Sequence, residues 1–434
     1  MDFIYISYTL IFYNQVMKKY LILCVFTILL GCKQDNMIDT EKYHIWCANP
    51  IATIDDGMVH LNWAVMFDDV LRPYEFVNPD QFDIYISQND MSNFHRLIEL
   101  NNDESYSYTV NNLQNGSSYL FYMVSKKKGF EPLYSDTIMV IPNKKKAVET
   151  ILTSDDHHTL WNVSIAQQKN KIAYVDGYYS WNEGNNMAVS VLISNLDGSE
   201  KELVRINSYG PRWSPANDKL VFFFDGILNV GWIPSQVALY DCNTKSITQL
   251  TDDTKYNYDP VFSKDGNLLL FQSGREMTTY FNGTESDIAN IWCINMKTLE
   301  SFQVTDISKT SIIIARYPCW IDSDRFLFDG FDSENNNYQL FESSVSNQQI
   351  KKVFNSKWND IQPSISPDQQ KIAFISDRSN TNQIWIYFIN TNTYSQITGY
   401  TNNESIESTN IEWLDNSTIA FTINGNQLVK QRID

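Results

Sequence analysis

The second half of the chain repeats one pattern of apolar and polar positions. Its clearest copy starts at Pro363, where an apolar residue precedes a Ser-Pro-Asp turn and an apolar run follows at 372–375. The copies are marked by Val163, Trp213, Phe262, Trp320, Ile365 and Trp413, at intervals of 50, 49, 58, 45 and 48 residues. A self-similar period of this size predicts a solenoid or a propeller.

Each copy has the composition of β-structure. Pro, Asp and Gly favour the turn, and the Val, Ile and Phe of the following run favour a strand. Further apolar runs come later in the copies, at 237–240, 291–294, 338–341 and 383–386, and then at 246–251, 301–305 and 394–398. With the short opening strand, this makes four strands per copy, which is the composition of a propeller blade.

The two ends of the repeat region predict how it closes. The sixth copy ends at Asp434 without its last run, and a matching run stands before the first copy, at 148–153. Closing a sheet array in this way removes exposed edges. We therefore predict that residues 147–434 form a six-bladed β-propeller, in which the strand beginning near Val148 completes the last blade.

Residues 45–142 predict a separate β-sandwich, so the fold class is all-β. Alternating apolar residues at 57–63, 82–87, 106–110, 119–124 and 135–141 are separated by turn signals, which is typical of a sandwich. The segment also contains Leu113, Gly116 and Tyr119 at a regular spacing.

The N-terminus has the layout of a secretory signal. A positive start at Met17 is followed by an apolar core at 20–30 and a small residue before Cys32. The apolar core is too short to span a bilayer as a helix. We take residues 1–32 as a signal peptide that starts at Met17, and the polar residues 33–44 as a tether.

The charge of the chain argues against nucleic acid as a partner, and its cysteine spacing does not decide between disulfides and free thiols. A net charge of −18 argues against nucleic acid, because phosphate neutralisation needs Lys and Arg. Beyond Cys32, the chain carries Cys47, Cys242, Cys293 and Cys319, widely spaced and without a metal-binding spacing. Disulfides and buried free thiols both remain possible for these four.

Three segments resemble known families. The pattern Pro-x-[Trp/Phe]-Ser-Pro-Asp, with Ile-Ala-Phe-x-Ser-Asp-Arg and Gln-Ile-Trp after it, resembles the WD-like (PD40-type) propeller repeats of TolB, over about residues 147–434. The Leu113-to-Tyr119 spacing, with Trp63 as a core residue, resembles a fibronectin type III domain. Residues 29–32 resemble a bacterial lipobox, in which Cys32 would be lipidated.

These resemblances imply a lipid-anchored protein of the bacterial envelope, at the outer membrane because Lys33 follows Cys32. Whether it faces the periplasm or the cell surface stays open. The TolB-like repeats imply partner binding in the periplasm. The fourth copy departs from the family, with Ile321-Asp322 for Ser-Pro and Asp329-Gly330 for Ser-Asp-Arg.

The sequence offers little sign of catalysis. It has no Gly-x-Ser-x-Gly nucleophile elbow, and only His157 and His158 fall in the propeller. Asp332–Asn336 does not follow the EF-hand order. We expect no catalytic residues, no metal and no cofactor. We expect Arg275 and Arg378, which follow the second strands of their copies, to form structural pairs with Asp.

The remaining candidate is a surface. In a propeller, the loops from second to third strand and from blade to blade share one face, and aromatic residues there suit contact with a partner. The candidate residues are Tyr178, Tyr179, Trp181, Trp232, Tyr256, Tyr258, Tyr280, Phe281, Tyr317, Trp358 and Tyr400. The sequence thus predicts a non-catalytic scaffold for an envelope protein or peptide. The alternative is a surface lipoprotein that binds carbohydrate or degrades a polysaccharide as a lyase or hydrolase.

Overall fold

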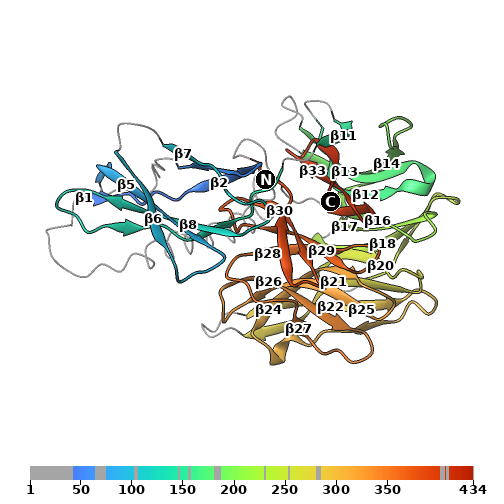
Figure 1. Ribbon diagram of the computed structural model, residues 1–434. Helices are drawn as coiled ribbons and strands as arrows, with labels where there is room; N and C mark the ends of the chain where they lie inside the picture. The colour runs from blue at the N-terminus through green and yellow to red at the C-terminus, as the bar shows by residue number, and fades with distance from the viewer. Residues whose placement is uncertain are drawn as a thin grey trace. The chain divides into compact units, whose positions relative to one another are not determined.

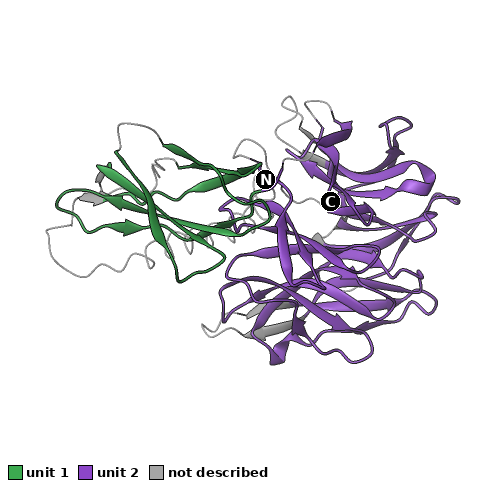
Figure 2. Cartoon of the chain, in the orientation of Figure 1, with its two compact units in different colours: residues 1–142 green, residues 143–434 purple. Residues whose placement is uncertain are grey.

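The computed structural model describes residues 43–63, 75–101, 106–144, 147–154, 158–179, 187–228, 231–252, 255–279, 285–400, 406 and 410–433. The chain divides into two compact units, residues 1–142 and 143–434 (Figure 2). Apart from two 3-10 helices, Gln167–Lys169 and Ile307–Lys309, the regular structure of the described residues is strands (Figure 1). The predicted all-β class is confirmed.

The first unit contains two antiparallel sheets. One sheet has the order β2 (Ile51–Asp55), β3 (Met58–Asn62), β7 (Ser107–Val110). The other has the order β10 (Ile138–Val140), β8 (Tyr119–Lys126), β5 (Gln81–Gln88), β6 (His95–Asn101), with β9 (Leu133–Tyr134) also on β8. A short parallel pair consists of β1 (Tyr43–Ile45) and β4 (Glu75–Val77).

One apolar core joins the two larger sheets of this unit. Alternate residues of β5, such as Phe82 and Ile84, are fully buried in it, as the two-residue period of a strand requires. Trp63 lies in the same core and is 3% exposed. At the start of β8, the Tyr119 hydroxyl accepts a hydrogen bond from the backbone N–H of Gln114 at 2.9 Å, the contact made by a tyrosine corner.

The second unit is built from antiparallel sheets in chain order. Three sheets have four strands each: β12 (Trp161–Ala166), β13 (Lys171–Tyr179), β14 (Met187–Asn195), β15 (Glu202–Ile206); β16 (Ser208–Trp213), β17 (Lys219–Leu228), β18 (Gly231–Asp241), β19 (Ser246–Gln249); and β28 (Asp360–Ile365), β29 (Lys371–Ser376), β30 (Gln383–Phe388), β31 (Thr393–Gln396).

Between them lies a larger sheet made of two four-stranded groups. The groups are β20 (Asn257–Phe262), β21 (Leu268–Thr279), β22 (Glu285–Asn295), β23 (Ser301–Gln303); and β24 (Ile312–Trp320), β25 (Arg325–Asp332), β26 (Asn337–Ser344), β27 (Lys351–Lys352). A single parallel bridge, Ala289 to Ile314, connects them. Each group therefore repeats the pattern of the other sheets.

The first strand of this unit pairs with its last. β11 (Val148–Thr153) lies antiparallel to β34 (Gln427–Arg432), with Val148 opposite Gln431, in a sheet completed by β33 (Thr418–Ile423) and β32 (Glu412–Asp415). The predicted closure by an N-terminal strand is confirmed. The ends stay joined beyond the strands, since the N–H of Leu160 donates to the Gly425 carbonyl at 2.7 Å.

The innermost strands follow one another around a ring. β12 contacts β16, which contacts β20, and the sequence continues through β24, β28 and β32, while β33 returns to β12. Apolar clusters fill the space between neighbouring sheets. The unit is a β-propeller. The number of blades stays a prediction.

Five inner strands that carry the repeat, β12, β16, β20, β24 and β28, break their pairing at a residue with positive φ. These residues are Asn162, Gly210, Asp259, Tyr317 and Gln362, with φ of 46°, 58°, 50°, 51° and 53°. In β16, β20, β24 and β28 a Pro follows this residue. The break is a β-bulge, which changes the direction in which the neighbouring side chains point.

This geometry corrects one sequence assignment. In β12, Val163 follows the positive-φ residue Asn162 and so occupies the place of the Pro. The residue equivalent to Trp213 in the first copy is therefore Ile165, and our choice of Val163 as its marker was wrong. The first copy has no Pro to fix the alignment, so spacing alone left the register ambiguous.

Tryptophans at the marker position join alternate sheets to the sheet before them. The indole N–H donates to a backbone carbonyl of the preceding inner strand in three cases: Trp213 to Ser164 at 3.1 Å, Trp320 to Val261 at 3.1 Å and Trp413 to Ser364 at 3.0 Å. In each case the accepting carbonyl belongs to the residue two after the positive-φ position or its equivalent. The repeat thus encodes contacts between sheets as well as strands.

We predict that Trp320→Phe lowers the free energy of unfolding by about 1–2 kcal/mol more than Trp385→Phe does. The first change leaves the Val261 carbonyl without its donor. Trp385 is equally buried, but its indole N–H has no hydrogen-bond partner in the part of the chain that the structure describes. Urea unfolding of both variants measures the difference, and equal losses would count against the role of this hydrogen bond.

Candidate functional site

Five of the predicted face residues have described side chains: Tyr256, Tyr258, Tyr317, Trp358 and Tyr400. Trp181, Tyr280 and Phe281 lie outside the described residues. For Tyr178, Tyr179 and Trp232, the structure describes the backbone as parts of β13 and β18.

Tyr400 was a wrong choice for the face. Its side chain is 9% exposed and belongs to an apolar core cluster with Ile397 and Phe421. Its ring centroid lies 6.5 Å from that of Phe421, in an edge-to-face contact. The aromatic residue packs between sheets, an outcome that loop position in the sequence does not reveal.

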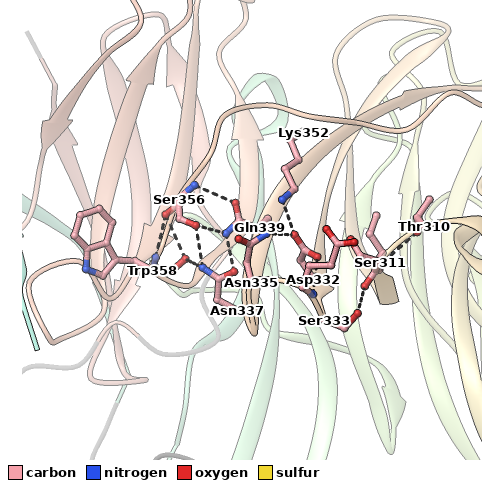
Figure 3. A network of polar contacts seen from close by, with 12 residues as sticks. Thr310, Ser311, Asp332, Ser333, Asn335, Asn337, Gln339, Lys352, Ser356 and Trp358 are labelled. Carbon is pink, nitrogen blue, oxygen red and sulfur yellow. Dashed lines mark hydrogen bonds and ion pairs between the residues drawn. The ribbon is translucent and has the colours of Figure 1, made fainter. Parts of the chain in front are cut away.

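Trp358 is held on the segment before β28 by a polar network (Figure 3). The side-chain amide of Asn337 donates to the Trp358 carbonyl at 2.8 Å, and the Trp358 N–H donates to the Ser356 hydroxyl at 3.2 Å. Gln339 donates to the Ser356 carbonyl at 2.5 Å. Side chains of β26 therefore fix the backbone that presents this half-buried indole.

The same network includes the acidic loop after β25. Asp332 is fully buried, and Lys352 and Asn335 each contact its carboxylate at 2.5 Å (Figure 3). Burial opposes ionisation, but hydrogen bonds from Lys352, Ser311 and Asn335 bring the pKa of Asp332 to about 2. The carboxylate is neutralised within the protein, as expected for a structural turn.

Four aromatic rings form a continuous array on β16, β17 and the start of β20. Tyr209 stacks on Phe223 at 5.4 Å between centroids, and Phe223 meets Tyr258 edge to face at 5.1 Å. Tyr258 in turn stacks on Tyr256 at 5.8 Å, with 9° between the rings. Tyr256 is 47% exposed, so this aromatic array runs from the interior to the surface.

A partly buried carboxyl lies beside the aromatic array. Asp225 accepts a short hydrogen bond from the Ser235 hydroxyl, and burial raises the pKa of its carboxyl. Burial, together with the charges of Asp225 and Asp259, also raises the pKa of Tyr258. The inner part of the array is therefore a site of low polarity that contains acceptor groups.

Charged and polar side chains gather on the inner strands next to the array. This central cluster comprises Arg212, Asp259, Arg316, Asp329, Gln362 and Glu412, from β16, β20, β24, β25, β28 and β32. Array and cluster meet at Gly210: a Cβ there would lie 2.7 Å from Phe223 and 3.8 Å from Asp259 Oδ1. A side chain at Gly210 would collide with the array, which explains the glycine.

One ion pair in the central cluster is complete. Arg316 Nε lies 2.6 Å from Asp329 Oδ1, and the other carboxylate oxygen accepts the Gln362 N–H at 2.8 Å. The Arg316 guanidinium also stacks over Tyr338 at 3.8 Å and lies 5.2 Å from the Tyr317 ring. Tyr317 lies in the inner strand β24 rather than in a loop, where the sequence had placed it.

The other members of the central cluster lack such partners. Arg212 donates to the Pro211 carbonyl at 3.3 Å, and no direct ion pair to it is found among the described residues. Burial raises the pKa of Asp259 to about 6, with Arg212 and Arg316 opposing the rise and Asp329 adding to it. Burial also raises the pKa of Glu412, opposed by Arg212.

Both arginines were expected just after a second strand, but only Arg378 lies there, after β29, whereas Arg275 lies within β21. Arg378, 2% exposed, pairs with the fully buried Asp360 at 2.9 Å inside a box of aromatic rings, as predicted for a structural pair. The contacts of Arg275 include the Ser301 hydroxyl at 2.8 Å, the Trp292 ring at 4.6 Å and the Phe271 ring at 5.4 Å. The pair with Asp was expected for both and is shown for Arg378.

His158 lies on the loop after β11 and contacts Asp176 of β13, with Nδ1 2.7 Å from Oδ2. No group of His, Cys, Asp and Glu suited to a metal is found in the described ranges. Among the described residues, Cys242, Cys293 and Cys319 form no disulfide. Within the part of the chain that the structure describes, no helix has the length and apolar character needed to cross a membrane.

Sequence reasoning missed most of this site. It identified Tyr256, Tyr258 and Tyr317, but not Tyr209, Phe223 or the charged residues of the central cluster. A signal was present: Arg212 follows, and Asp259 precedes, the Pro of its copy. These positions flank the bulge, which the sequence alone does not reveal.

No family model matches the chain, and no curated protein matches its sequence. Similar solved structures include TolB from Acinetobacter baumannii, 15% identical, covering 74% of this chain and 77% of that one, with a TM-score of 0.41. An oligogalacturonate lyase from Vibrio parahaemolyticus is 13% identical, with 79% and 96% covered and a TM-score of 0.41. The β-propeller domain of a trilobed protease from Pyrococcus furiosus is 13% identical, with 64% and 97% covered and a TM-score of 0.42. Scores this low carry no argument, and the fold assignment rests on the strand pairing.

We predict that Asp259 makes stability fall as pH rises between about 4 and 6. Its pKa of about 6 in the folded state exceeds the ordinary 3.8, so the folded protein binds this proton more tightly than the unfolded chain. The stability of the wild type relative to Asp259→Asn should therefore fall by on the order of 1–3 kcal/mol across this window and then level off.

Urea unfolding at several pH values measures this difference. Asp265→Asn serves as the control, because hydrogen bonds from Ser263 and Asn267 lower the pKa of Asp265 in the turn after β20. The stability of the wild type relative to Asp265→Asn should not fall between pH 4 and 6. A pH-independent difference for Asp259→Asn would contradict the assignment of a buried, titrating carboxyl.

Proposed function

We propose that this chain is a non-catalytic envelope lipoprotein that binds a protein or peptide through the loop-rich face of its propeller. The observation that carries the proposal is the aromatic array, which reaches the surface at the 47% exposed Tyr256. Tyrosine is enriched at protein interfaces because it offers a large rigid surface together with a hydroxyl. The central cluster beside the array supplies polar groups that would orient a partner.

We infer that the propeller has six blades and that the first unit is a fibronectin type III-like sandwich. The ring of inner strands from β12 to β32, and its return to β12 through β33, supports six blades. Two packed sheets, the buried Trp63 and the hydrogen bond to the Tyr119 hydroxyl support the sandwich. In this arrangement the propeller provides the site and the sandwich is a spacer or second contact.

A second candidate function, carbohydrate binding, is favoured by one observation. Tyr256 and Tyr258 stack in parallel with the carboxyls of Asp225 and Asp259 nearby. An open aromatic face next to acidic groups suits a sugar ring, which combines apolar C–H groups with hydroxyl donors. This candidate includes lyase or hydrolase activity on a polysaccharide.

We predict that Tyr256→Ala weakens partner binding at least tenfold, since truncation of an aromatic anchor commonly costs about 2 kcal/mol or more. A photo-crosslinking residue at position 256 should capture the partner in intact cells, and purified partner then gives the affinity by calorimetry. Tyr134→Ala is the matched control, because Tyr134 is 59% exposed in the first unit.

Unchanged affinity in Tyr256→Ala would refute the proposed face. A glycan array separates the two functions: sugar binding that depends on Tyr256, with no crosslinked protein, establishes the carbohydrate candidate instead. Loss of a measurable polysaccharide degradation on addition of a chelator would overturn the non-catalytic scaffold.

We further predict that Cys32→Ser releases the protein from the membrane fraction. Cys32 lies outside the described residues, and the expectation follows from its place after the apolar core of the signal. Fractionation and fatty-acid labelling of the wild type and variant test it. Equal labelling of both proteins would exclude lipidation at this cysteine.

A further inference from the structure

The charges of the central cluster do not balance. Asp329 neutralises Arg316 at 2.6 Å. The remaining cation, Arg212, faces two carboxyls, Asp259 and Glu412, and makes no direct ion pair with either among the described residues. One carboxylate is therefore in excess at the centre of the propeller.

The unpartnered groups of the central cluster are mainly acceptors. The carboxyls of Asp259 and Glu412 are partly exposed, and neither makes a side-chain hydrogen bond or a direct ion pair with a described residue. Gln362 is 9% exposed, and its buried Oε1 has no hydrogen-bond partner among the described residues. It occupies in β28 the positive-φ place before the Pro that Asp259 occupies in β20. Buried polar groups are normally satisfied, so the Gln362 oxygen indicates that a donor is bound here in the working protein, and the two partly exposed carboxyls of the cluster are open to the same donor.

The approach to these acceptors is aromatic. Tyr258 precedes Asp259 directly, and its ring continues through Tyr256 to the surface. Aromatic faces attract cations as well as apolar groups, with an effect that increases when the cation is desolvated. An aromatic entrance that leads to surplus carboxyl groups is thus complementary to a positively charged side chain.

We infer that the central cluster receives a lysine or arginine side chain of the bound peptide, with Asp259, Glu412 and Gln362 as acceptors. This inference rests on the proposed peptide-binding function. Arg212 stays beside the carboxyls and limits the site to a single cationic group. The exposed Lys264 lies on the turn after β20. Like Arg212, it opposes the rise in the pKa of the Cys319 thiol.

The site also predicts how pH affects binding. The charged groups that face Asp259 are Arg212, Arg316 and Asp329. Because the pKa of Asp259 is about 6, its carboxyl is mostly neutral at pH 5 and mostly charged at pH 7. Preference for a cation should therefore increase from pH 5 to pH 7.

The test compares two labelled peptides on the full-length protein by fluorescence anisotropy. One is Gly-Gly-Ser-Arg-Ser-Gly-Gly, and the other carries neutral citrulline in place of arginine. We expect the arginine peptide to bind about tenfold more tightly at pH 7, and the preference to shrink at pH 5. Asp259→Asn and Glu412→Gln should each reduce the preference to within about threefold, while Asp259→Glu retains it.

The control is Asp197→Asn, a change in an exposed turn that should leave the preference intact. Thermal unfolding and circular dichroism confirm that each variant is folded. Equal binding of the two peptides, binding of neither, or a preference that survives both Asp259→Asn and Glu412→Gln would overturn the inference. If one of these results is found but the crosslinker at position 256 still captures a protein partner, the proposed function stands and only the cation site is refuted. If no partner is captured either, both proposals are refuted.

Discussion

The pairing of β11 with β34 is the constraint on which the rest of the second unit depends. It brings residues from opposite ends of the repeat region into one sheet, with Val148 opposite Gln431. Without it, the last sheet would expose an edge and the inner strands would have no reason to form a ring. The central cluster exists only because that ring places side chains from distant copies next to one another.

Within the ring, the bulge before each Pro determines what the centre contains. A residue with positive φ interrupts β12, β16, β20, β24 and β28 at equivalent points. Non-glycine residues in this conformation cost roughly 1–3 kcal/mol each, so their recurrence implies that the surrounding sheets enforce them. The residues on either side of the Pro supply the polar groups of the centre, including Arg212 and Asp259. The same strands carry the carbonyls that accept the indole N–H of the next sheet.

The centre is unusual because its polar groups are only partly satisfied. Arg316 forms a direct ion pair with Asp329, and Arg378 forms one with Asp360 within a blade. The buried Gln362 amide oxygen has no partner among the described residues, and the partly exposed carboxyls of Asp259 and Glu412 make no direct ion pair there. Burying such groups is costly, and binding proteins commonly accept this cost where a ligand supplies the missing contacts. This contrast separates groups that hold the fold from groups available for recognition.

The sequence by itself determined the repeat, its β character and the strand that closes the ring, because these follow from local apolar periodicity and turn chemistry. It also predicted the pairing of Arg378 with an Asp, and it named Tyr256 and Tyr258 as candidates for the binding face. It failed for Val163, where no Pro fixed the register, and for Tyr400, which packs in a core. Only the tertiary structure brought Asp329 and Glu412, which belong to two other copies, to the copy that contains Tyr209, Arg212 and Phe223. Their proximity depends on ring closure and bulge geometry, which are long-range properties that no single stretch of sequence contains.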